Sequence, residues 1–171
     1  MIFLDETGFT TAMARPGGYA PRGQRLTAAV PQRHWKTTTF VAGLTARGLI
    51  APRVLDGPMD AAAFTAYVEQ VLAPEARRGD LAILDNLPAH KTARVQAALA
   101  RCRIEYLYLP PYSPDFNPIE NAFSKLKRSV RAAGERTVEG LWAAIGRLIE
   151  QVRPAECRSY LRHCGYDATK T

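Results

Sequence analysis

The sequence lacks the features of a membrane-spanning or secreted protein. No apolar run approaches the ~20 residues that a membrane-spanning helix needs. The apolar stretch MIFL at the amino terminus is too short for a signal peptide, and no basic residue precedes it. We therefore expect a cytoplasmic protein with no membrane partner.

Cysteine is also scarce, which argues against a disulfide framework. The three cysteines, Cys102, Cys157 and Cys164, are an odd number without a CxxC pair, as expected for reduced thiols in the cytoplasm. Cys157 and Cys164 lie near His163, but a structural zinc site needs a fourth ligand. The fold must therefore rest on a hydrophobic core, and 171 residues with 47% hydrophobic content suffice for a single domain spanning 1–171.

Acidic residues are outnumbered, which points to a polyanionic partner. Lys and Arg total 23 against 16 Asp and Glu, for a net charge of +7, and neutralised phosphates release counterions on binding. Net charge does not say where the charge lies, so a merely basic soluble protein is the alternative. The basic residues cluster, however, and Lys125, Lys127, Arg128 and Arg131 are predicted to contact DNA. A solvated basic helix face remains the other interpretation.

Hydrophobic patterning predicts an α/β fold with a mixed sheet covered by helices. Short apolar or β-branched runs predict strands at 1–5, 37–45, 48–55, 81–85 and 104–110. Helical spacing predicts helices at 61–74, with Asp60 as N-cap, and at 91–102, 118–132, 137–151 and 154–163. Residues 8–36, rich in Gly, Pro and Arg, are predicted to form an irregular or hairpin connection. The first three strands suggest an antiparallel meander, and the last two alternate with helices as parallel strands do.

Two aspartates follow buried strands. Asp5 ends the run MIFLD and Asp85 ends LAILD. Each alone suits a turn, since Asp-Glu-Thr-Gly and the neighbours Asn86 and Pro88 are good turn chemistry. Sites in α/β sheets, however, form at the carboxyl ends of strands, and two carboxylates brought together there repel unless a cation holds them. The pair therefore favours a metal site.

A third carboxylate, Glu120, lies in NPIENAFSKLK at the start of a basic helix. With Asn117 as N-cap and Pro118 at the first helical position, Glu120 falls where a capping box places a glutamate, which is the structural alternative. Lys127 lies two turns further along the same face, where it could meet a DNA phosphate. We expect the carboxyl oxygens of the three acidic residues to converge to about 4–6 Å, within reach of a shared metal ion.

The ligand types favour Mg²⁺ or Mn²⁺, because three carboxylates without clustered His or Cys suit hard cations better than zinc. Two such ions can activate the attacking oxygen and stabilise the leaving oxygen of an in-line displacement. Asn86 and His90 follow Asp85 closely enough to support the site or to contact DNA. A purely structural histidine is the alternative.

Four strings in the sequence resemble the catalytic domain of the mariner-related bacterial insertion-sequence transposases, part of the DDE superfamily. They are FLDETGF, GPMDAAAFTAYVEQVLAP, ILDNLPAHK and LPPYSPDFNPIENAFSKLK. The resemblance implies an RNase H-like fold with a five-stranded sheet, and it assigns the metal-binding and catalytic triad to Asp5, Asp85 and Glu120. It also implies Mg²⁺-dependent (or Mn²⁺-dependent) hydrolysis at transposon ends, followed by 3′-hydroxyl strand transfer into target DNA, typically at TA.

The same resemblance sets expectations for partners and location. Double-stranded DNA is the implied partner, and because two ends must be paired, self-association on DNA is expected in a bacterial, nucleoid-associated setting. Relatives carry helix-turn-helix modules before the catalytic domain; here that region is expected to be absent or separately encoded. The alternatives are an RNase H-like nuclease or resolvase that does not join DNA, and a non-catalytic DNA-binding remnant.

Overall fold

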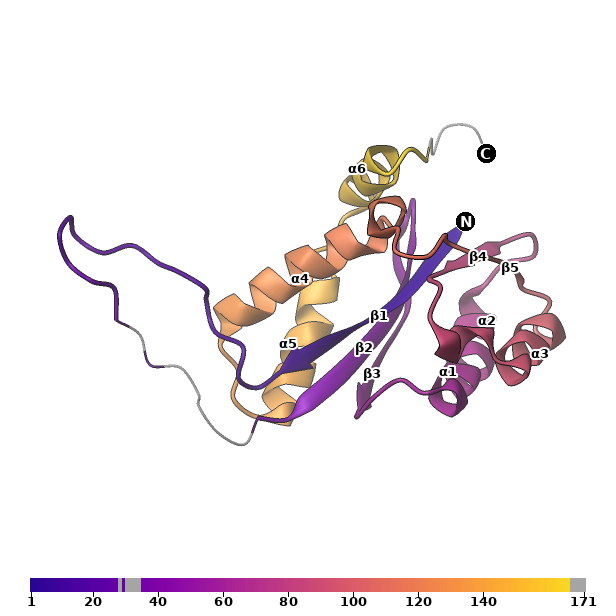
Figure 1. Ribbon diagram of the computed structural model, residues 1–171, viewed down its shortest axis with the longest axis horizontal. Helices are drawn as coiled ribbons and strands as arrows, with labels where there is room; N and C mark the ends of the chain where they lie inside the picture. Colours follow the sequence, from indigo (N-terminus) through magenta and orange to yellow (C-terminus); the bar gives the residue numbers. More distant parts are fainter. Residues whose placement is uncertain (28, 30–34, 167–171) are drawn as a thin grey trace.

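Five strands form one mixed sheet in the order β3-β2-β1-β4-β5 (Figure 1). The computed structural model describes residues 1–27, 29 and 35–166. The strands are β1 (Ile2–Thr10), β2 (Thr37–Thr45), β3 (Gly48–Asp56), β4 (Leu81–Leu84) and β5 (Glu105–Tyr108). Strands β1, β2 and β3 pair antiparallel, whereas β4 pairs parallel with both β1 and β5. The predicted meander followed by two parallel strands is confirmed.

Helices form wherever the spacing of apolar residues predicted them. They are α1 (Ala61–Tyr67), continuing through a π-helical turn at Val68–Leu72 into α2 (Ala73–Glu75), then α3 (Ala93–Arg101), α4 (Ile119–Ala133), α5 (Val138–Ile149) and α6 (Pro154–His163). The N-cap prediction for Asp60 is confirmed, since its Oδ1 accepts from the backbone N–H of Ala63 at 2.8 Å. Within the described ranges, no helix has the length and apolar character needed to cross a membrane.

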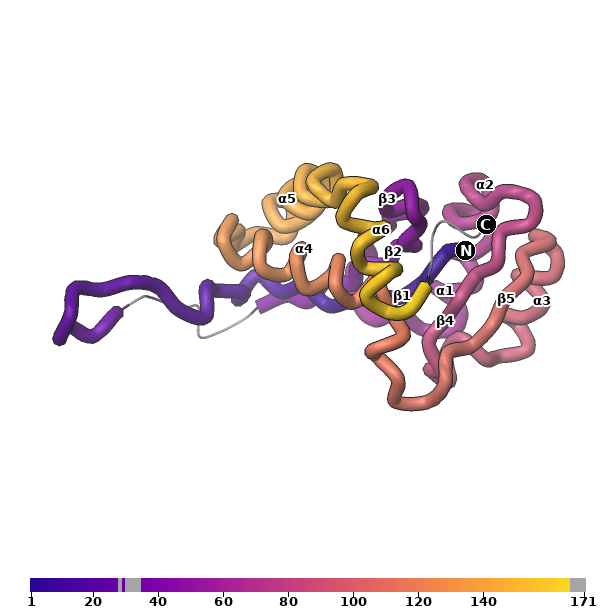
Figure 2. Tube along the Cα trace, turned by 90° about the horizontal axis from the view of Figure 1, so that it is seen from above, coloured from indigo at the N-terminus to yellow at the C-terminus, as the bar shows by residue number. Residues whose placement is uncertain are grey.

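The sheet separates two hydrophobic cores, because alternate side chains of each strand point to opposite faces. Phe3 of β1 belongs to the core under α4, α5 and α6, while its neighbours Ile2 and Leu4 belong to the core under α1 and α3. Figures 1 and 2 show the two groups of helices on opposite sides of the sheet. By this alternation Asp5 falls on the α4 side.

Strand β1 is longer than predicted and runs past Asp5 to Thr10. A turn at Asp-Glu-Thr-Gly was the structural alternative for Asp5, but β2 is long enough to pair with β1 up to Thr10, which lies opposite Thr37. The expectation that Asp5 ends a strand is therefore wrong. Pairing of β1 with β4, however, stops at Leu4 opposite Leu84, so Asp5 still lies where the parallel part of the sheet ends.

The segment after β1 forms an arm that leaves the body of the domain. Residues 11–27 project beyond the end of α4 (Figures 1 and 2). Two contacts fix the base of the arm: Nη1 of Arg136 donates to the carbonyls of Thr11 and Met13 at 3.1 and 2.8 Å. Residues 8–36 were predicted to be irregular, and the described residues after Thr10 agree with this prediction.

Candidate active site

The register of the sheet brings Asp5 and Asp85 together. Leu4 lies opposite Leu84 in a parallel pair of strands, whose backbones lie about 4.8 Å apart. The two aspartates that follow, Asp5 within β1 and Asp85 directly after β4, are therefore neighbours. Helix α4 packs on the same side of β1 and begins beside them, which brings Glu120 to the same place. All three predicted carboxylates line one open cleft of about 590 Å³.

Asp5 is the buried member of the three, with 6% of its surface exposed. Its Oδ1 accepts from the backbone N–H of Glu6 at 2.8 Å, and its Oδ2 accepts from Nδ2 of Asn117 at 2.8 Å. Burial, and after it the negative charges of Asp85 and Glu120, together raise the pKa of Asp5 from 3.8 to about 8. At neutral pH this carboxyl is mostly protonated unless positive charge enters the cleft.

Asp85 is held by a buried histidine. Nδ1 of His90 lies 2.6 Å from Oδ1 of Asp85, and the backbone N–H of Leu87 donates to the same oxygen at 3.1 Å. His90 is fully buried, and its ring centroid lies 4.1 Å from that of Phe64. A direct contact between His90 and DNA is therefore excluded in this conformation. The other interpretation, support of Asp85, agrees with the geometry.

The same histidine faces a second carboxylate, Glu6. Nε2 of His90 lies 3.2 Å from Oε2 of Glu6, close enough for charge attraction although neither atom has a hydrogen bond of good geometry among the described residues. Burial lowers the pKa of His90, but the interactions with Asp85 and Glu6 outweigh burial and raise it to about 9. The ring is thus a cation between two carboxylates, and it fixes the orientation of Asp85.

Replacing His90 with Phe tests this support, because Phe keeps the stack on Phe64 and removes both ring nitrogens. We expect His90→Phe to destabilise the fold by about 3 kcal/mol, since the carboxylates of Glu6 and Asp85 lose their buried counter-charge. Mn²⁺ affinity should fall about 10- to 100-fold, as for other residues that orient metal ligands. Denaturant unfolding and calorimetric Mn²⁺ titration measure the two effects. Lower stability with unchanged Mn²⁺ affinity would leave His90 a purely structural role.

Glu120 does not serve as the predicted helix cap. Helix α4 begins at Ile119 with Pro118 at the N-cap position, and this helix start has no capping hydrogen bond from a described side chain. Asn117, predicted to be the N-cap, is 5% exposed and uses its side-chain amide on Asp5 instead. The capping-box alternative therefore fails, and the exposed Glu120 side chain borders the cleft.

Asn86 lines the cleft beside Asp85. Its Oδ1 is buried and accepts no hydrogen bond from the residues that the structure describes. A buried carbonyl oxygen without a donor is costly, so a bound group that offers a donor or a cation would stabilise it. The position agrees with the prediction that Asn86 supports the site.

The predicted convergence of the three carboxylates is incomplete. Across residues 1–27, 29 and 35–166, no three His, Cys, Asp or Glu side chains are grouped closely enough to hold a metal ion as they stand. Three ionised carboxylates at 4–6 Å would repel strongly, and partners within the chain hold Asp5 and Asp85 instead. The donors are the right oxygen ligands for Mg²⁺ or Mn²⁺, but they must draw together to bind it.

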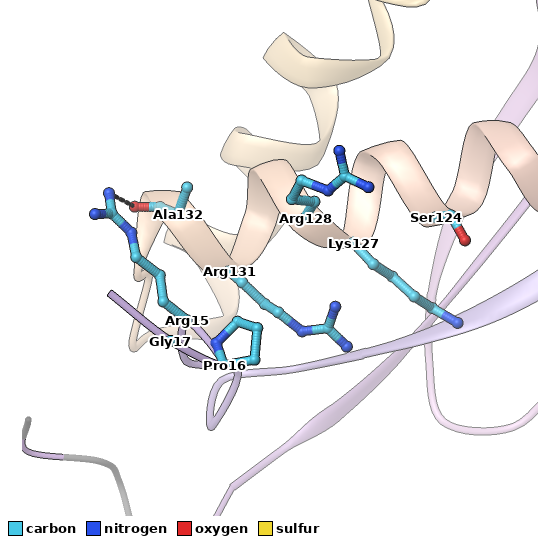
Figure 3. A pocket seen from close by; sticks show the side chains of 8 residues that line it. All are labelled: Arg15, Pro16, Gly17, Ser124, Lys127, Arg128, Arg131 and Ala132. Atoms are coloured by element: carbon cyan, nitrogen blue, oxygen red, sulfur yellow. Dashed lines mark hydrogen bonds between the residues drawn. The ribbon is translucent and has the colours of Figure 1, made fainter. Parts of the chain in front are cut away.

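A basic groove lies further along α4. Lys127, Arg128 and Arg131 line a hollow of about 500 Å³ together with Arg15 from the arm. Figure 3 shows Lys127 and Arg131 reaching out on the same side of the helix, while the guanidinium of Arg15 turns to the carbonyl of Ala132, its acceptor at 3.3 Å. None of the described residues that line this groove is acidic. Its charge is suited to a polyanion.

The groove and the acidic cleft are parts of one surface. Ser124, one turn after Glu120, lines both the basic groove and the shallow recess that Glu120 borders. A chain of phosphates that entered the cleft at Glu120 could therefore continue past Ser124 to Lys127. This agrees with the predicted alignment of Glu120 and Lys127 along one helix face.

Lys125 differs from the other predicted DNA contacts. Its ammonium donates to both carboxylate oxygens of Glu156 at 2.7 Å and to the carbonyl of Gln151 at 2.8 Å. These bonds tie α4 to the start of α6. The sequence prediction could not separate Lys125 from Lys127, because the partner lies 31 residues away in the sequence. A stabilising role within the chain accounts for Lys125 without DNA.

Sequence reasoning missed three residues of the site: Glu6, Asn117 as a partner of Asp5, and Arg15. Glu6 follows Asp5 directly and therefore points to the opposite face of β1, where His90 lies. The alternation of side chains along a strand would have placed Glu6 on that face if β1 had been predicted to continue past Asp5. The contacts of Asn117 and Arg15 cross 112 and 117 residues of sequence, and no local pattern indicates them.

Two transposases are similar to most of the chain. The chain is 29% identical over 170 residues to the Tcb1 transposase of Caenorhabditis briggsae, covering 89% of this chain and 61% of that protein. It is also 29% identical over 195 residues to the Tc1 transposase of Caenorhabditis elegans, covering 99% of this chain and 69% of that protein. The chain thus spans about two thirds or less of these relatives' length.

Solved structures of the Mos1 transposase share the fold. A paired-end complex with the left transposon end matches with a TM-score of 0.73 and 21% identity, covering 96% of this chain and 51% of that one. A mariner Mos1 paired-end complex with Mg matches with a TM-score of 0.72 and 18% identity, covering 96% and 53%. The predicted RNase H-like fold is confirmed. A protein-family profile described as DDE superfamily endonuclease matches residues 1–141, and the chain belongs to that family.

Proposed function

We propose that this domain is the catalytic part of a mariner-related DNA transposase of the bacterial insertion-sequence kind. It hydrolyses phosphodiester bonds at transposon ends and then joins the freed 3′-hydroxyl to target DNA, with TA as the expected target. The observation that carries the proposal is the shared cleft of Asp5, Asp85 and Glu120, which continues into the basic groove of α4. Membership of the endonuclease family supports the reaction class.

Each side chain has a role in this reaction. Asp5, Asp85 and Glu120 would hold two Mg²⁺ or Mn²⁺ ions, which supply charge to activate the attacking oxygen and stabilise the leaving one. His90 orients Asp85, and Asn117 orients Asp5. Lys127, Arg128 and Arg131 bind the phosphates next to the scissile bond, which fixes the DNA strand over the cleft.

The proposed reaction also needs the transposon ends to be recognised and brought together. The chain spans 61% of the Tcb1 transposase, so the activity of a whole transposase, including this recognition, is part of the proposal. Pairing of two ends further requires two copies of the domain to assemble on DNA. Sedimentation of the domain with and without DNA duplexes tests this assembly.

A joining assay tests the function and separates it from simple hydrolysis. The domain is incubated with Mg²⁺ or Mn²⁺, a supercoiled plasmid, and a labelled duplex that ends in a free 3′-hydroxyl. A transposase transfers the label to the plasmid, whereas an RNase H-like nuclease or resolvase nicks the plasmid and leaves it unlabelled. A non-catalytic remnant binds the plasmid without nicking it. Only the transfer of label supports the proposal.

The basic groove predicts a defined salt dependence. Lys127→Ala should weaken DNA binding and lower the slope of log K against log salt by about 0.9, the contribution of about one phosphate contact. Arg94→Ala is the matched control, because Arg94 is an exposed helical cation on α3, on the other face of the sheet. Fluorescence anisotropy between 50 and 300 mM salt (about a sixfold range) measures both slopes. Equal changes in the two variants would mean that only net charge matters.

A further inference from the structure

Tyr112 is an aromatic residue that the fold itself does not use. It lines the same cleft as Asp5, Asp85 and Glu120, yet its side chain is 102% exposed. Its backbone has a φ of 53°, a left-handed conformation that a bulky side chain adopts only at a cost in energy. A large apolar ring is thus held in solvent, in a strained conformation, at the rim of the candidate active site.

The surrounding loop restrains the backbone of Tyr112. Pro110 and Pro111 precede Tyr112 and Pro114 follows two residues later, and each proline restricts its own φ to about −65°. Oγ of Ser113 also donates to the carbonyl of Pro111 at 3.1 Å. The backbone that carries the ring therefore loses little conformational freedom when something packs against Tyr112, which lowers the cost of a contact there.

The rest of the cleft indicates what Tyr112 contacts. Apart from the carboxylates and the side chains of Asn86, Asn117 and Ser113, the lining is apolar and includes Leu87, which is 43% exposed. Carboxylates repel a phosphate backbone unless cations lie between them, and the apolar lining offers no hydrogen bonds to the edge of a base. The face of a base, in contrast, stacks on aromatic rings whatever its sequence.

We propose that Tyr112 stacks on a nucleobase of the DNA strand whose phosphodiester enters the carboxylate cleft, and so positions that bond. This inference rests on the proposed function, because it takes the occupant of the cleft to be DNA. Bases inside a duplex are already stacked on their neighbours, so the ring reaches a base only at a strand end, at a nick, or where a base leaves the helix. Unpaired DNA is therefore the preferred occupant.

Two single-stranded probes of equal charge test the stacking contact. One is a labelled 20-mer of deoxyadenosine, and the other is a 20-mer of abasic deoxyribose phosphate; both lengths exceed the roughly 4–16 nucleotides of a typical binding site. Fluorescence anisotropy gives the ratio of the affinities for the deoxyadenosine and abasic probes. The basic groove contributes equally to both affinities, because both probes carry the same phosphates, so its contribution cancels in the ratio. Tyr112→Phe should keep the wild-type ratio, and Tyr112→Ala should lower it about 5- to 100-fold.

Tyr19→Ala is the matched control, since Tyr19 is equally exposed, at 104%, but lies on the arm. It should keep the base preference of the wild type. An equal loss of base preference in Tyr112→Ala and Tyr19→Ala would mean that the preference does not come from the cleft, and it would overturn the proposal. A wild type that binds both probes equally well would overturn it too. A large drop in the melting temperature of Tyr112→Ala would mean that the ring stabilises the fold, which would also overturn the proposal. So would a changed oligomeric state with intact base preference, because the ring would then contact another protein chain.

Metal-dependent nicking of plasmid DNA, measured on the same proteins, separates this proposal from the proposed function. Tyr112→Ala should nick more slowly by about the factor lost in base preference. If the wild type prefers base-bearing DNA through Tyr112 but neither nicks nor joins DNA, stacking is supported and the transposase proposal fails. If the wild type nicks and joins DNA while Tyr112→Ala keeps full base preference, only the stacking proposal fails.

Discussion

Replacing Glu120 with Gln should reduce metal-dependent DNA cleavage about 10³-fold or more, equivalent to about 4 kcal/mol of transition-state stabilisation. The reason is that Gln keeps the size of the side chain and removes the charge that a divalent cation needs. Nicking of supercoiled plasmid in Mg²⁺ or Mn²⁺ measures the loss. DNA affinity should change little in metal-free buffer, because Lys127, Arg128 and Arg131 remain.

Glu139→Gln is a close control for this variant. Glu120 and Glu139 are each the second residue of a helix, α4 and α5, and both are exposed. The negative charge of each side chain therefore interacts to a similar extent with the amino-terminal end of its helix dipole, which stabilises the fold by about 0.3–1 kcal/mol. Both variants should lose that small stability, but only Glu120→Gln should lose cleavage. If Glu120→Gln cleaved as well as Glu139→Gln, Glu120 would serve the helix alone.

Local patterns account for most of the predicted fold. Strands β2 and β3 were expected at 37–45 and 48–55, and the structure has them at Thr37–Thr45 and Gly48–Asp56. These limits were readable because β-branched residues and a Gly-containing turn are local signals. The cap at Asp60 is equally local, since donor and acceptor lie three residues apart. Predictions succeeded where the deciding interaction lay within a few residues.

Predictions failed where a distant partner decides. Strand β1 was predicted to end at Asp5, where the apolar run ends and a turn is the local alternative, but pairing with β2 extends the strand to Thr10. Asn117 was predicted to cap the helix, yet its amide donates to Asp5 instead. Contact of Lys125 with DNA stays a prediction, but its bond to Glu156 was not foreseen. In each case one side chain suits two roles, and only the tertiary fold selects between them.

The sequence indicated which carboxylates line the cleft, but it did not indicate how far apart they lie or whether they are ionised. Asp5, Asp85 and Glu120 were expected in one place because strand ends and a helix start meet at a sheet edge, and all three line one cleft. Their separation depends on the balance of repulsion, burial and local hydrogen bonds, none of which the sequence displays. The raised pKa of Asp5 is the clearest measure of that balance.

Replacing Asp5 with Asn should therefore stabilise the metal-free protein at neutral and alkaline pH. The pKa of Asp5 is raised from 3.8 to about 8, first by burial and then by Asp85 and Glu120. Between these two values the unfolded chain has lost a proton that the folded chain still holds, so wild-type stability falls as pH rises. Below 3.8 both states hold the proton, and above about 8 both have released it and the loss is complete.

The expected gain follows from the size of the shift. Each pKa unit corresponds to about 1.4 kcal/mol, so the stability difference between Asp5→Asn and wild type should grow by about 5 kcal/mol from pH 4 to pH 8. Urea unfolding in chelator, repeated at each pH, measures the difference. Asp56→Asn is the control, because Asp56 is exposed at the end of β3, and its difference from wild type should stay near zero at every pH.

A divalent cation should offset the instability that Asp5 causes at alkaline pH, because the cation binds the ionised carboxyl. This result would link the pH dependence to a metal site in the cleft. With Mn²⁺ at 100 times its dissociation constant, binding stabilises a folded protein by about 2.7 kcal/mol, and this gain needs the ionised Asp5 that Asn cannot supply. At pH 8 the wild type should therefore gain most of that amount, whereas Asp5→Asn should gain little and Asp56→Asn should match the wild type. An equal gain in all three proteins would place the ion elsewhere. A difference between Asp5→Asn and wild type that does not change with pH would mean that the carboxyl of Asp5 is not destabilised by its neighbours, and that the three carboxylates do not share one site.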